Sequence, residues 1–278
     1  MKPYDIKKLK TEGAVTIPYP ADLREAVEKS IGLWKKFTAL PTGVKKNLPY
    51  SNNADGVGYE LKDGSGPKGD RKENFDIATG GEEWLKENLG KIESPVAREF
   101  VTHVTSLVKV MKPTILQFAR DVEAEFGLEG FEKEVEESEP GFFVRFIHYF
   151  GDREVGEETA TSHVDQSGFT LHLFESAPGF QCLSYDGKWI DVPISCGDQT
   201  VLINSMQMQL RSKGELKALC HRVVATPETA REGRYSAVCF VQLKGTRKYD
   251  KTKSGRLQEK NPGFNYEMPI EEFAGMFK

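Results

Sequence analysis

The sequence predicts a mainly β protein with flanking helices, because helical patterns fill its first half and short strand candidates crowd its second half. From residue 142 onward, segments rich in β-forming residues recur at short spacing, separated by turn sequences such as 185–188 and 195–198. The predicted strands are 142–150, 168–174, 180–184, 188–192, 200–204, 219–225 and 234–243. Candidate site residues come from well-separated strands, so two sheets must close around one pocket. A double-stranded β-helix, or jelly roll, has this arrangement.

The first half predicts a strand and several helices. Residues 14–17 form a strand candidate, and residues 21–34 follow with apolar residues on one helical face. Residues 82–135 predict two helices; the longer, from Pro95 to about Phe126, is expected to be kinked or divided at Pro113. The acidic residues 132–139 are expected at a solvated helix end.

We expect one domain over residues 1–278, organised in three parts. These are an N-terminal strand and helical part (1–140), a catalytic jelly-roll core (141–245) and a C-terminal tail (246–278). Residues 51–70 are dense in Gly, Asn and Asp and predict a loop near the mouth of the site. The tail predicts a loop followed by a short amphipathic helix.

Composition favours a small-molecule partner. The chain has 38 basic and 42 acidic residues, a net charge of −4, and no basic block, so nucleic acid and anionic membranes are poor partners. No apolar run reaches the length of a membrane span, and the first residues lack the apolar segment of a signal peptide. The four scattered cysteines are expected to be reduced. We therefore expect a cytoplasmic monomer.

A His-x-Asp pair is the first candidate for metal binding. In an extended strand, residues i and i+2 project from the same face, so His163 and Asp165 offer a nitrogen and an oxygen to one ion. His221 opens a second β-like run and is expected to supply a third ligand from a facing strand. Two histidines and one carboxylate form the facial triad of non-haem Fe(II) oxygenases. A structural zinc site would need four ligands, and no paired cysteines are present.

An Arg-x-Ser pair predicts an anion site beside this triad. Arg234 and Ser236 share one face of a strand that is otherwise apolar. A buried arginine needs an anion, and its planar fork suits a carboxylate bound through two hydrogen bonds. An internal Arg–Glu pair is the alternative.

The other histidines are not assigned to the metal. His148 is expected to point away from the site, and His172 is expected to be a satisfied polar residue. His103 lies on a helical segment and is expected at the surface or in packing.

These segments together resemble the Fe(II)/2-oxoglutarate-dependent dioxygenases, specifically the isopenicillin N synthase-like branch. The matching residues in the core are His163-x-Asp165, Trp189…Val192-Pro193, Gly214…His221-Arg-Val and Arg234-Tyr-Ser236. Weaker landmarks upstream are Gly13–Ile17, Phe37–Pro41 with Lys45, Gly58-Tyr59 and Lys72–Phe75. Together they cover most of the chain in the order typical of the family.

The resemblance implies a ligand set, co-substrates and a reaction. Fe(II) would be held by His163, Asp165 and His221, while Arg234 and Ser236, with Tyr149, would hold the far carboxylate of 2-oxoglutarate. With O2, the co-substrate would be converted to succinate and CO2 while a small organic molecule is oxidised, by default through hydroxylation.

The chain also departs from the family pattern. Ile147 stands where the family often has an asparagine, and Met206-Gln207 stand where it has Gly-Asp. These changes concern the orientation of the co-substrate rather than the class of reaction. Two alternatives remain: an Fe(II) oxidase that needs no 2-oxoglutarate, and a non-catalytic jelly-roll binding protein. The complete triad weighs against the second.

Overall fold

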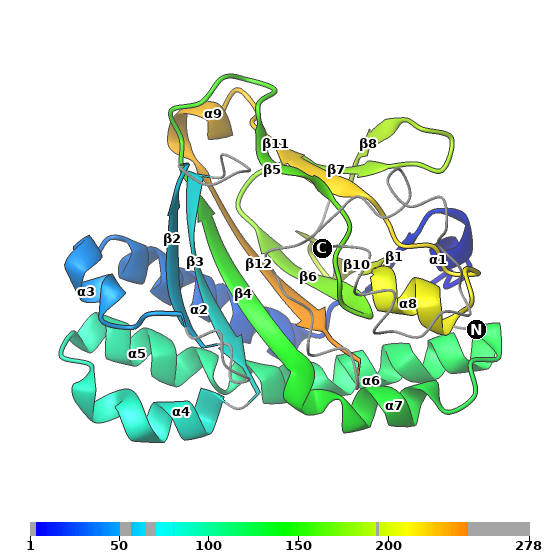
Figure 1. Cartoon of the computed structure of the whole chain (residues 1–278), viewed down its shortest axis with the longest axis horizontal. Helices are drawn as coiled ribbons and strands as arrows, with labels where there is room; N and C mark the ends of the chain where they lie inside the picture. Colours follow the sequence, from blue (N-terminus) through cyan, green and yellow to red (C-terminus); the bar gives the residue numbers. More distant parts are fainter. Residues whose placement is uncertain (1–3, 51–56, 65–70, 80, 193–194, 244–278) are drawn as a thin grey trace.

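The computed structural model describes residues 4–50, 57–64, 71–79, 81–192 and 195–243, which form two antiparallel sheets and a layer of helices (Figure 1). The larger sheet has the order β1 (Ala14–Pro18), β10 (Gln199–Asn204), β6 (Phe169–Glu175), β12 (Arg234–Val241), β4 (Phe142–Tyr149), β3 (Arg71–Ala78) and β2 (Gly58–Asp63), with β9 (Ser195–Cys196) paired to β10. The smaller sheet has the order β5 (Glu158–His163), β11 (His221–Val224), β7 (Phe180–Leu183) and β8 (Trp189–Asp191). This architecture confirms the predicted mainly β fold with flanking helices and a jelly-roll core.

The helices lie mainly along one side of the larger sheet (Figure 1). Those that precede the core are α1 (Lys8–Thr11), α2 (Ala21–Thr38), α3 (Thr42–Lys46), α4 (Gly81–Asn88), α5 (Pro95–Val104), α6 (Leu107–Phe126) and α7 (Phe131–Glu137). Two short helices, α8 (Met206–Arg211) and α9 (Thr229–Glu232), interrupt the strands, and short 3-10 turns span Leu89–Lys91 and Glu139–Gly141. None of the described helices is long and apolar enough to cross a bilayer.

The predicted division of the long helix at Pro113 is wrong. The helix is interrupted at Thr105 and Ser106, between α5 and α6, whereas Pro113 lies inside α6. The hydroxyls of Thr105 and Ser106 donate to the carbonyls of Thr102 and His103, at 2.9 and 2.7 Å, and such local bonds compete with the helical pattern. The acidic residues from 132 to 137 belong to a separate helix, α7, rather than to the end of a longer one.

In the first half of the chain, two strands are present where the sequence predicted none. Residues 58–63, expected in a loop, form β2, and residues 71–78 form β3, which pairs with β4. Their charged residues obscure the strand pattern, and the pairing with β4 supplies the backbone partners that fix them. The predicted tail helix at 246–278 and the rest of the loop at 51–70, namely 51–56 and 65–70, lie outside the described residues.

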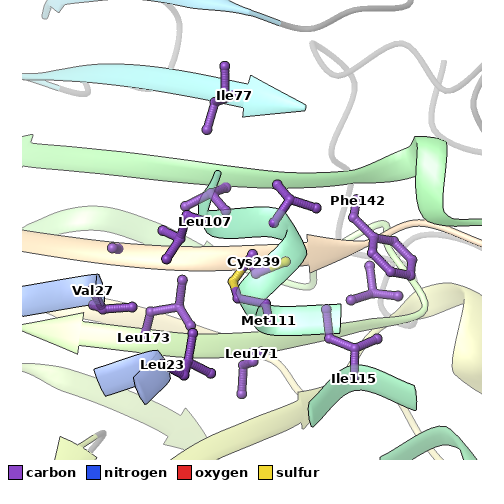
Figure 2. Packing of buried hydrophobic residues seen from close by; sticks show 14 of the residues in the cluster. Leu23, Val27, Ile77, Leu107, Met111, Ile115, Phe142, Leu171, Leu173 and Cys239 are labelled. Atoms are coloured by element: carbon purple, nitrogen blue, oxygen red, sulfur yellow. The ribbon is translucent and has the colours of Figure 1, made fainter. Parts of the chain in front are cut away.

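The larger sheet has two different faces because strand side chains alternate. Its outer face packs against the helices in the main hydrophobic core, where Leu23 and Val27 of α2 and Met111 of α6 surround Leu171 of β6 and Cys239 of β12 (Figure 2). Aromatic rings extend this core: Phe100 lies 5.1 Å from Phe37 and 5.5 Å from Phe146, between ring centroids.

The inner face of the larger sheet meets the smaller sheet in a second hydrophobic cluster. This cluster contains Ile147, Tyr149, Ala160, Phe180, Cys182, Val201, Ile203, Leu219 and Val223, drawn from both sheets and the segment before β11. Because side chains alternate along a strand, the faces of the remaining side chains follow. On β12, Ala237, Cys239 and Val241 belong to the helix-side core, so Arg234 and Ser236 face inward. The inner face therefore contains the predicted anion site.

We expect truncation of Phe100 to lower stability strongly, because this side chain is fully buried among aromatic rings in the main hydrophobic core. We expect Phe100→Ala to lower the free energy of unfolding by about 3–5 kcal/mol, because it removes apolar contacts and leaves a cavity. Urea unfolding measures this. Val155→Ala is the control, since Val155 is 63 % exposed and its truncation should change stability little. Equal effects of the two substitutions would contradict the assignment of the core.

Candidate metal centre and carboxylate site

Three side chains converge at one point on the smaller sheet. His163, Asp165 and His221 each offer one ligand atom, and these atoms all lie within 4.8 Å of one another. Asp165 Oδ1 is 3.4 Å from His163 Nε2 and 3.7 Å from His221 Nε2. Ligands at right angles around a divalent ion, with bonds of about 2.1 Å, lie about 3 Å apart. The three residues therefore fit one metal ion with little adjustment.

Strand pairing positions the two histidines. His221 of β11 is the direct Cα partner of His163 of β5, and directly opposed residues project to the same side of a sheet. The third ligand thus comes from the adjacent strand of the same sheet, and the expectation of a facing strand was wrong. Asp165 follows the end of β5 rather than lying within it, because β5 ends at His163.

Hydrogen bonds orient both imidazole rings. The Nδ1 atoms of His163 and His221 lie 2.7 and 3.1 Å from the carbonyls of Thr161 and Leu219. A carbonyl can only accept, so each Nδ1 carries the proton and each Nε2 keeps a free lone pair towards Asp165. Bonds of this kind fix the tautomer of metal-binding histidines. The donor set is therefore suited to a metal and not only to an ion pair.

The charge states of these groups also suit a metal. Burial lowers the pKa of His221 to about 4, so its ring is neutral near pH 7 and free to act as a ligand. For Asp165, burial by itself would raise the pKa, but His221, His163 and a hydrogen bond from Thr170 hold it well below its usual range. Thr170 Oγ1 donates to Asp165 Oδ2 at 2.6 Å and leaves Oδ1 directed at the histidines. The sequence reasoning did not identify Thr170.

Backbone hydrogen bonds hold the loop that carries Asp165. The N–H of Met206 donates to the Asp165 carbonyl at 2.9 Å, and the N–H of Gln207 donates to the Ser167 carbonyl at 3.0 Å. The Met206-Gln207 pair, which departs from the family pattern, thus supports the ligand loop through its backbone. Backbone contacts depend little on side-chain identity, so the departure leaves the ligand position unaffected.

The predicted carboxylate site lies on β12 and β4. Arg234, which is 2 % exposed, is the Cα partner of Tyr149, and its guanidinium lies 5.9 Å from the centroid of the Tyr149 ring. Ser236 is also buried and on the same face. Burial lowers the pKa of Arg234 to about 10, so the guanidinium is charged near neutral pH. The three residues form a buried cationic site with hydroxyl groups around it.

An internal acid already occupies one edge of this site. Arg234 Nη2 forms a close ion pair with Glu175 Oε1, from the end of β6, and Arg234 Nε donates to the Ala177 carbonyl at 3.0 Å. Glu175 is also the Cα partner of Ser236. The Arg–Glu pair left open by the sequence is therefore present. A guanidinium carries five N–H donors, and these contacts engage only Nε and Nη2, so it keeps donor capacity for a second carboxylate.

Two of the three remaining histidines lie where the sequence predicted. His148 Nδ1 is 2.9 Å from Glu73 Oε1, and its ring stacks on Tyr235, away from the metal ligands. His103 Nε2 lies 3.3 Å from the Ala26 carbonyl in helix packing. His172 was expected to be a satisfied polar residue, and this was wrong: its buried Nε2 has no hydrogen-bond partner among the residues described.

A cavity of about 450 Å³ lies outside this centre. It is bounded by α1, β1 and the β7–β8 hairpin, and Tyr185 and Ile190 lie at its rim. Cys182, the Cα partner of His221, lines its inner end. The three candidate ligands do not line it, so the cavity is not assigned to the chemistry.

Comparison with known proteins relates this chain to one family of enzymes. The 2OG-Fe(II) oxygenase superfamily matches residues 141–243, the part that carries all six candidate site residues. A 2-oxoglutarate-dependent dioxygenase of Didymella fabae is 27% identical over 252 residues, covering 78% of this chain and 72% of the relative.

Solved structures share the fold. A full-length Neurospora crassa protein, in complex with alpha-KG and thymine, superposes with a TM-score of 0.68 at 18% identity, covering 97% of this chain and 88% of that one. Dioxygenase for auxin oxidation 1 of Arabidopsis thaliana, bound to 2-oxoglutarate, superposes with a TM-score of 0.66 at 17% identity, covering 85% of each chain.

The chain has a core, residues 141–243, that matches the 2OG-Fe(II) oxygenase superfamily. It is a 2-oxoglutarate-dependent dioxygenase that uses Fe(II), and its His-Asp-His cluster is a site of the kind this chemistry requires. The assignment to the isopenicillin N synthase-like branch stays a prediction.

The Arg234–Glu175 pair generates a prediction about stability. Glu175→Gln should lower the free energy of unfolding by about 3 kcal/mol in the absence of ligand, because it leaves a buried guanidinium without its counter-charge. Thermal or urea unfolding measures the change. Glu232→Gln is the matched control, since Glu232 pairs with Arg231 on the surface and such pairs contribute little. An unchanged stability of the Glu175 variant would show that the pair does not form.

Proposed function

We propose that the enzyme hydroxylates a small organic molecule, with His163, Asp165 and His221 as the iron ligands and Arg234, Ser236 and Tyr149 as the anchor for 2-oxoglutarate. The observation that carries this proposal is the convergence of two Nε2 atoms and one carboxylate oxygen within 4.8 Å. Such a triad leaves coordination positions open for small molecules. A buried, charged Arg234 on the inner face of the opposite sheet supports the co-substrate site.

The proposed ligands determine where the reaction takes place. Fe(II), when bound, supplies the activation of O2 and the chelation of the keto acid end of 2-oxoglutarate. The side chains would hold this ion from one side, since His163 and His221 are paired on neighbouring strands and Asp165 lies two residues after the end of β5. The other side faces the space between the two sheets, where a substrate is shielded from water by the second hydrophobic cluster.

Arg234 and Ser236 would determine the orientation of the co-substrate. A carboxylate can accept hydrogen bonds from a guanidinium and a hydroxyl at once, and a charged donor strengthens them. Fixing one end of 2-oxoglutarate at Arg234 aims its other end at the triad, so that the reacting groups meet in one geometry. Glu175 must share the guanidinium or rotate away when the second carboxylate arrives, because both carry negative charge.

The reaction balances with one molecule of each reactant. A C–H bond of the substrate is broken and a C–O bond is formed, with one oxygen atom of O2 entering the new hydroxyl. The second oxygen atom enters the carboxylate of succinate, as 2-oxoglutarate loses its first carbon as CO2 and supplies two electrons.

The ligands named in the two solved complexes, thymine and alpha-KG in one and 2-oxoglutarate in the other, support a small molecule as substrate and 2-oxoglutarate as co-substrate.

Anaerobic titration with 2-oxoglutarate tests the anchor. Fe(II)-loaded wild-type protein should develop a weak visible charge-transfer band, and Arg234→Ala should require at least about thirtyfold more 2-oxoglutarate, because a buried charge pair contributes about 2 kcal/mol or more. Arg231→Ala is the matched control, since Arg231 is exposed on α9 near the same strand. No band in the wild type, with iron bound, would contradict the use of 2-oxoglutarate. Equal titrations of the two variants would contradict the role of Arg234.

Removal of a ligand tests the metal site. His221→Ala should bind Fe(II) far more weakly than the wild type and release no succinate from 2-oxoglutarate, because two protein ligands hold the ion less tightly than three. Metal content after gel filtration and succinate release measure these effects. His103→Ala, on α5, should retain both properties. Full iron content in the His221 variant would show that the three residues do not form the metal site.

A further inference from the structure

Two buried polar side chains on the inner face have no hydrogen-bond partner within the part of the chain that the structure describes. They are His172 of β6, at its Nε2, and Asn74 of β3, at both atoms of its amide. The two are 4 % and 1 % exposed, so bulk water does not satisfy them. A buried polar group without a partner costs about 1–3 kcal/mol, and such groups in native proteins call for an explanation.

We propose that His172 is a positioning residue for the co-substrate, with its ring nitrogen hydrogen-bonded to 2-oxoglutarate between the metal ligands and Arg234. This inference rests on the proposed function, and it gives a role to a residue that the sequence predicted to be a satisfied polar group.

The alternation of β6 directs His172 into the site. Phe169, Leu171 and Leu173 belong to the helix-side core, so Thr170 and His172 face inward. Thr170 bonds Asp165, which shows that this face of β6 reaches the metal ligands. The His172 ring also lies 4.5 Å from the Phe180 ring, whose centroid is 5.3 Å from that of His221.

Strand pairing and electrostatic interactions place His172 near both parts of the co-substrate site. It is the Cα partner of Val238, two residues beyond Ser236 on β12, and it interacts electrostatically with His221, Asp165 and Arg234. Burial, helped by His221 and Arg234 and opposed by Asp165, lowers the pKa of His172 to about 3, so the ring is neutral. A neutral imidazole carries one N–H and can donate it to a carboxylate oxygen. A ligand that spans from the metal to Arg234 would therefore pass the unpartnered nitrogen.

Two variants separate positioning from packing. His172→Phe keeps an aromatic ring but removes the nitrogens, and His172→Gln restores a donor. We expect His172→Phe to melt at the same temperature as the wild type or a few degrees higher, because it removes an unsatisfied polar group. It should bind 2-oxoglutarate at least about fivefold more weakly, and His172→Gln should recover part of this loss.

The measurement is thermal unfolding of Mn(II)-loaded protein with increasing 2-oxoglutarate, since Mn(II) allows binding to be followed apart from turnover. A wild type that 2-oxoglutarate does not stabilise would overturn the proposed function itself. A stabilised wild type with unchanged affinity in His172→Phe would overturn only the role of His172. A lower melting temperature of His172→Phe without ligand, with unchanged affinity, would show that His172 is a packing residue.

A separate observation concerns Asn74, and we infer that its amide recognises the molecule that is oxidised. On β3, Phe75 and Ile77 belong to the helix-side core, so Asn74 faces inward with Lys72 and Asp76. Asn74 is the Cα partner of Ile147, which is in turn the partner of Ser236. Two strand spacings separate Asn74 from Ser236, or about 10 Å. That distance leaves room for a small molecule beside the co-substrate.

The chemistry of the amide defines the class of substrate. Asp76 is held by Arg145 through two bonds of 2.7 and 2.6 Å, so that acid is already paired. The Asn74 carbonyl can accept and its NH2 can donate side by side, and both are unpartnered within the described chain. The complementary group is an edge with an adjacent donor and acceptor, such as an amide, an imide or a protonated acid. A site with buried amide groups discriminates strongly against analogues that lack this edge.

Stimulation of succinate release tests this inference. We expect uracil or benzamide to raise the release of succinate above the rate with 2-oxoglutarate alone, and toluene and cyclohexanone to have no such effect. Asn74→Leu, of similar volume, should abolish the stimulation by uracil and benzamide. Glu60→Gln, on the neighbouring strand β2, serves as the control.

Each possible result of the succinate-release experiment tests one part of this inference. No succinate from the wild type with Fe(II) and 2-oxoglutarate would overturn the proposed function. Succinate release without stimulation by either uracil or benzamide would overturn the amide-edge class. Equal stimulation in Asn74→Leu and wild type would overturn the role of Asn74, and a change in the rate without substrate would show that Asn74 acts on the co-substrate site instead.

Discussion

The pairing of β11 with β5 holds the two histidines of the proposed metal centre together. Residues that face each other across an antiparallel pair have their side chains on the same side of the sheet, and here the opposed residues are His163 and His221. Their ring centroids are 4.4 Å apart. A shift of one residue in this register would move one ring to the other face and remove a ligand. The backbone hydrogen bonds of the smaller sheet therefore position the two histidine ligands of the proposed metal centre.

The larger sheet supplies the second half of the site through its two unlike faces. Its outer face is apolar and is covered by α2, α5 and α6, and its inner face carries Arg234, Ser236, Tyr149, His172 and Asn74. Burial of the outer face is favourable by about 25 cal/mol per Å² of apolar surface, and this stabilisation keeps the strands in register. Polar groups on the inner face lower the stability, and the burial of the outer face against the helices offsets this loss.

Buried polar groups are the main departure of this molecule from the usual rules of packing. Arg234 is paired with Glu175, whereas His172 Nε2 and the Asn74 amide have no described partner. A protein selected for stability alone would replace such groups by apolar ones. These groups lie around the space between the proposed metal ligands and the proposed anion site. Their cost in stability is therefore explained by the proposed binding of small molecules rather than by the fold.

Local patterns in the chain predicted the class of fold, which the structure confirms, and they indicated the candidate ligands and the candidate anion site. Period-two alternation predicted the core strands, and the i, i+2 spacing of Arg234 and Ser236 predicted their common face. The arrangement of the strands in space was needed to show which strand lies beside which. It placed His221 next to His163 in one sheet, paired Glu175 with Arg234, and left the nitrogen of His172 and the amide of Asn74 without partners among the described residues. The structure also has its helix break at Thr105 rather than at Pro113, and it has two strands, β2 and β3, in segments rich in charged residues. The physical reason is that hydrogen-bond pairing and burial depend on contacts between residues distant in the chain, which no local pattern contains.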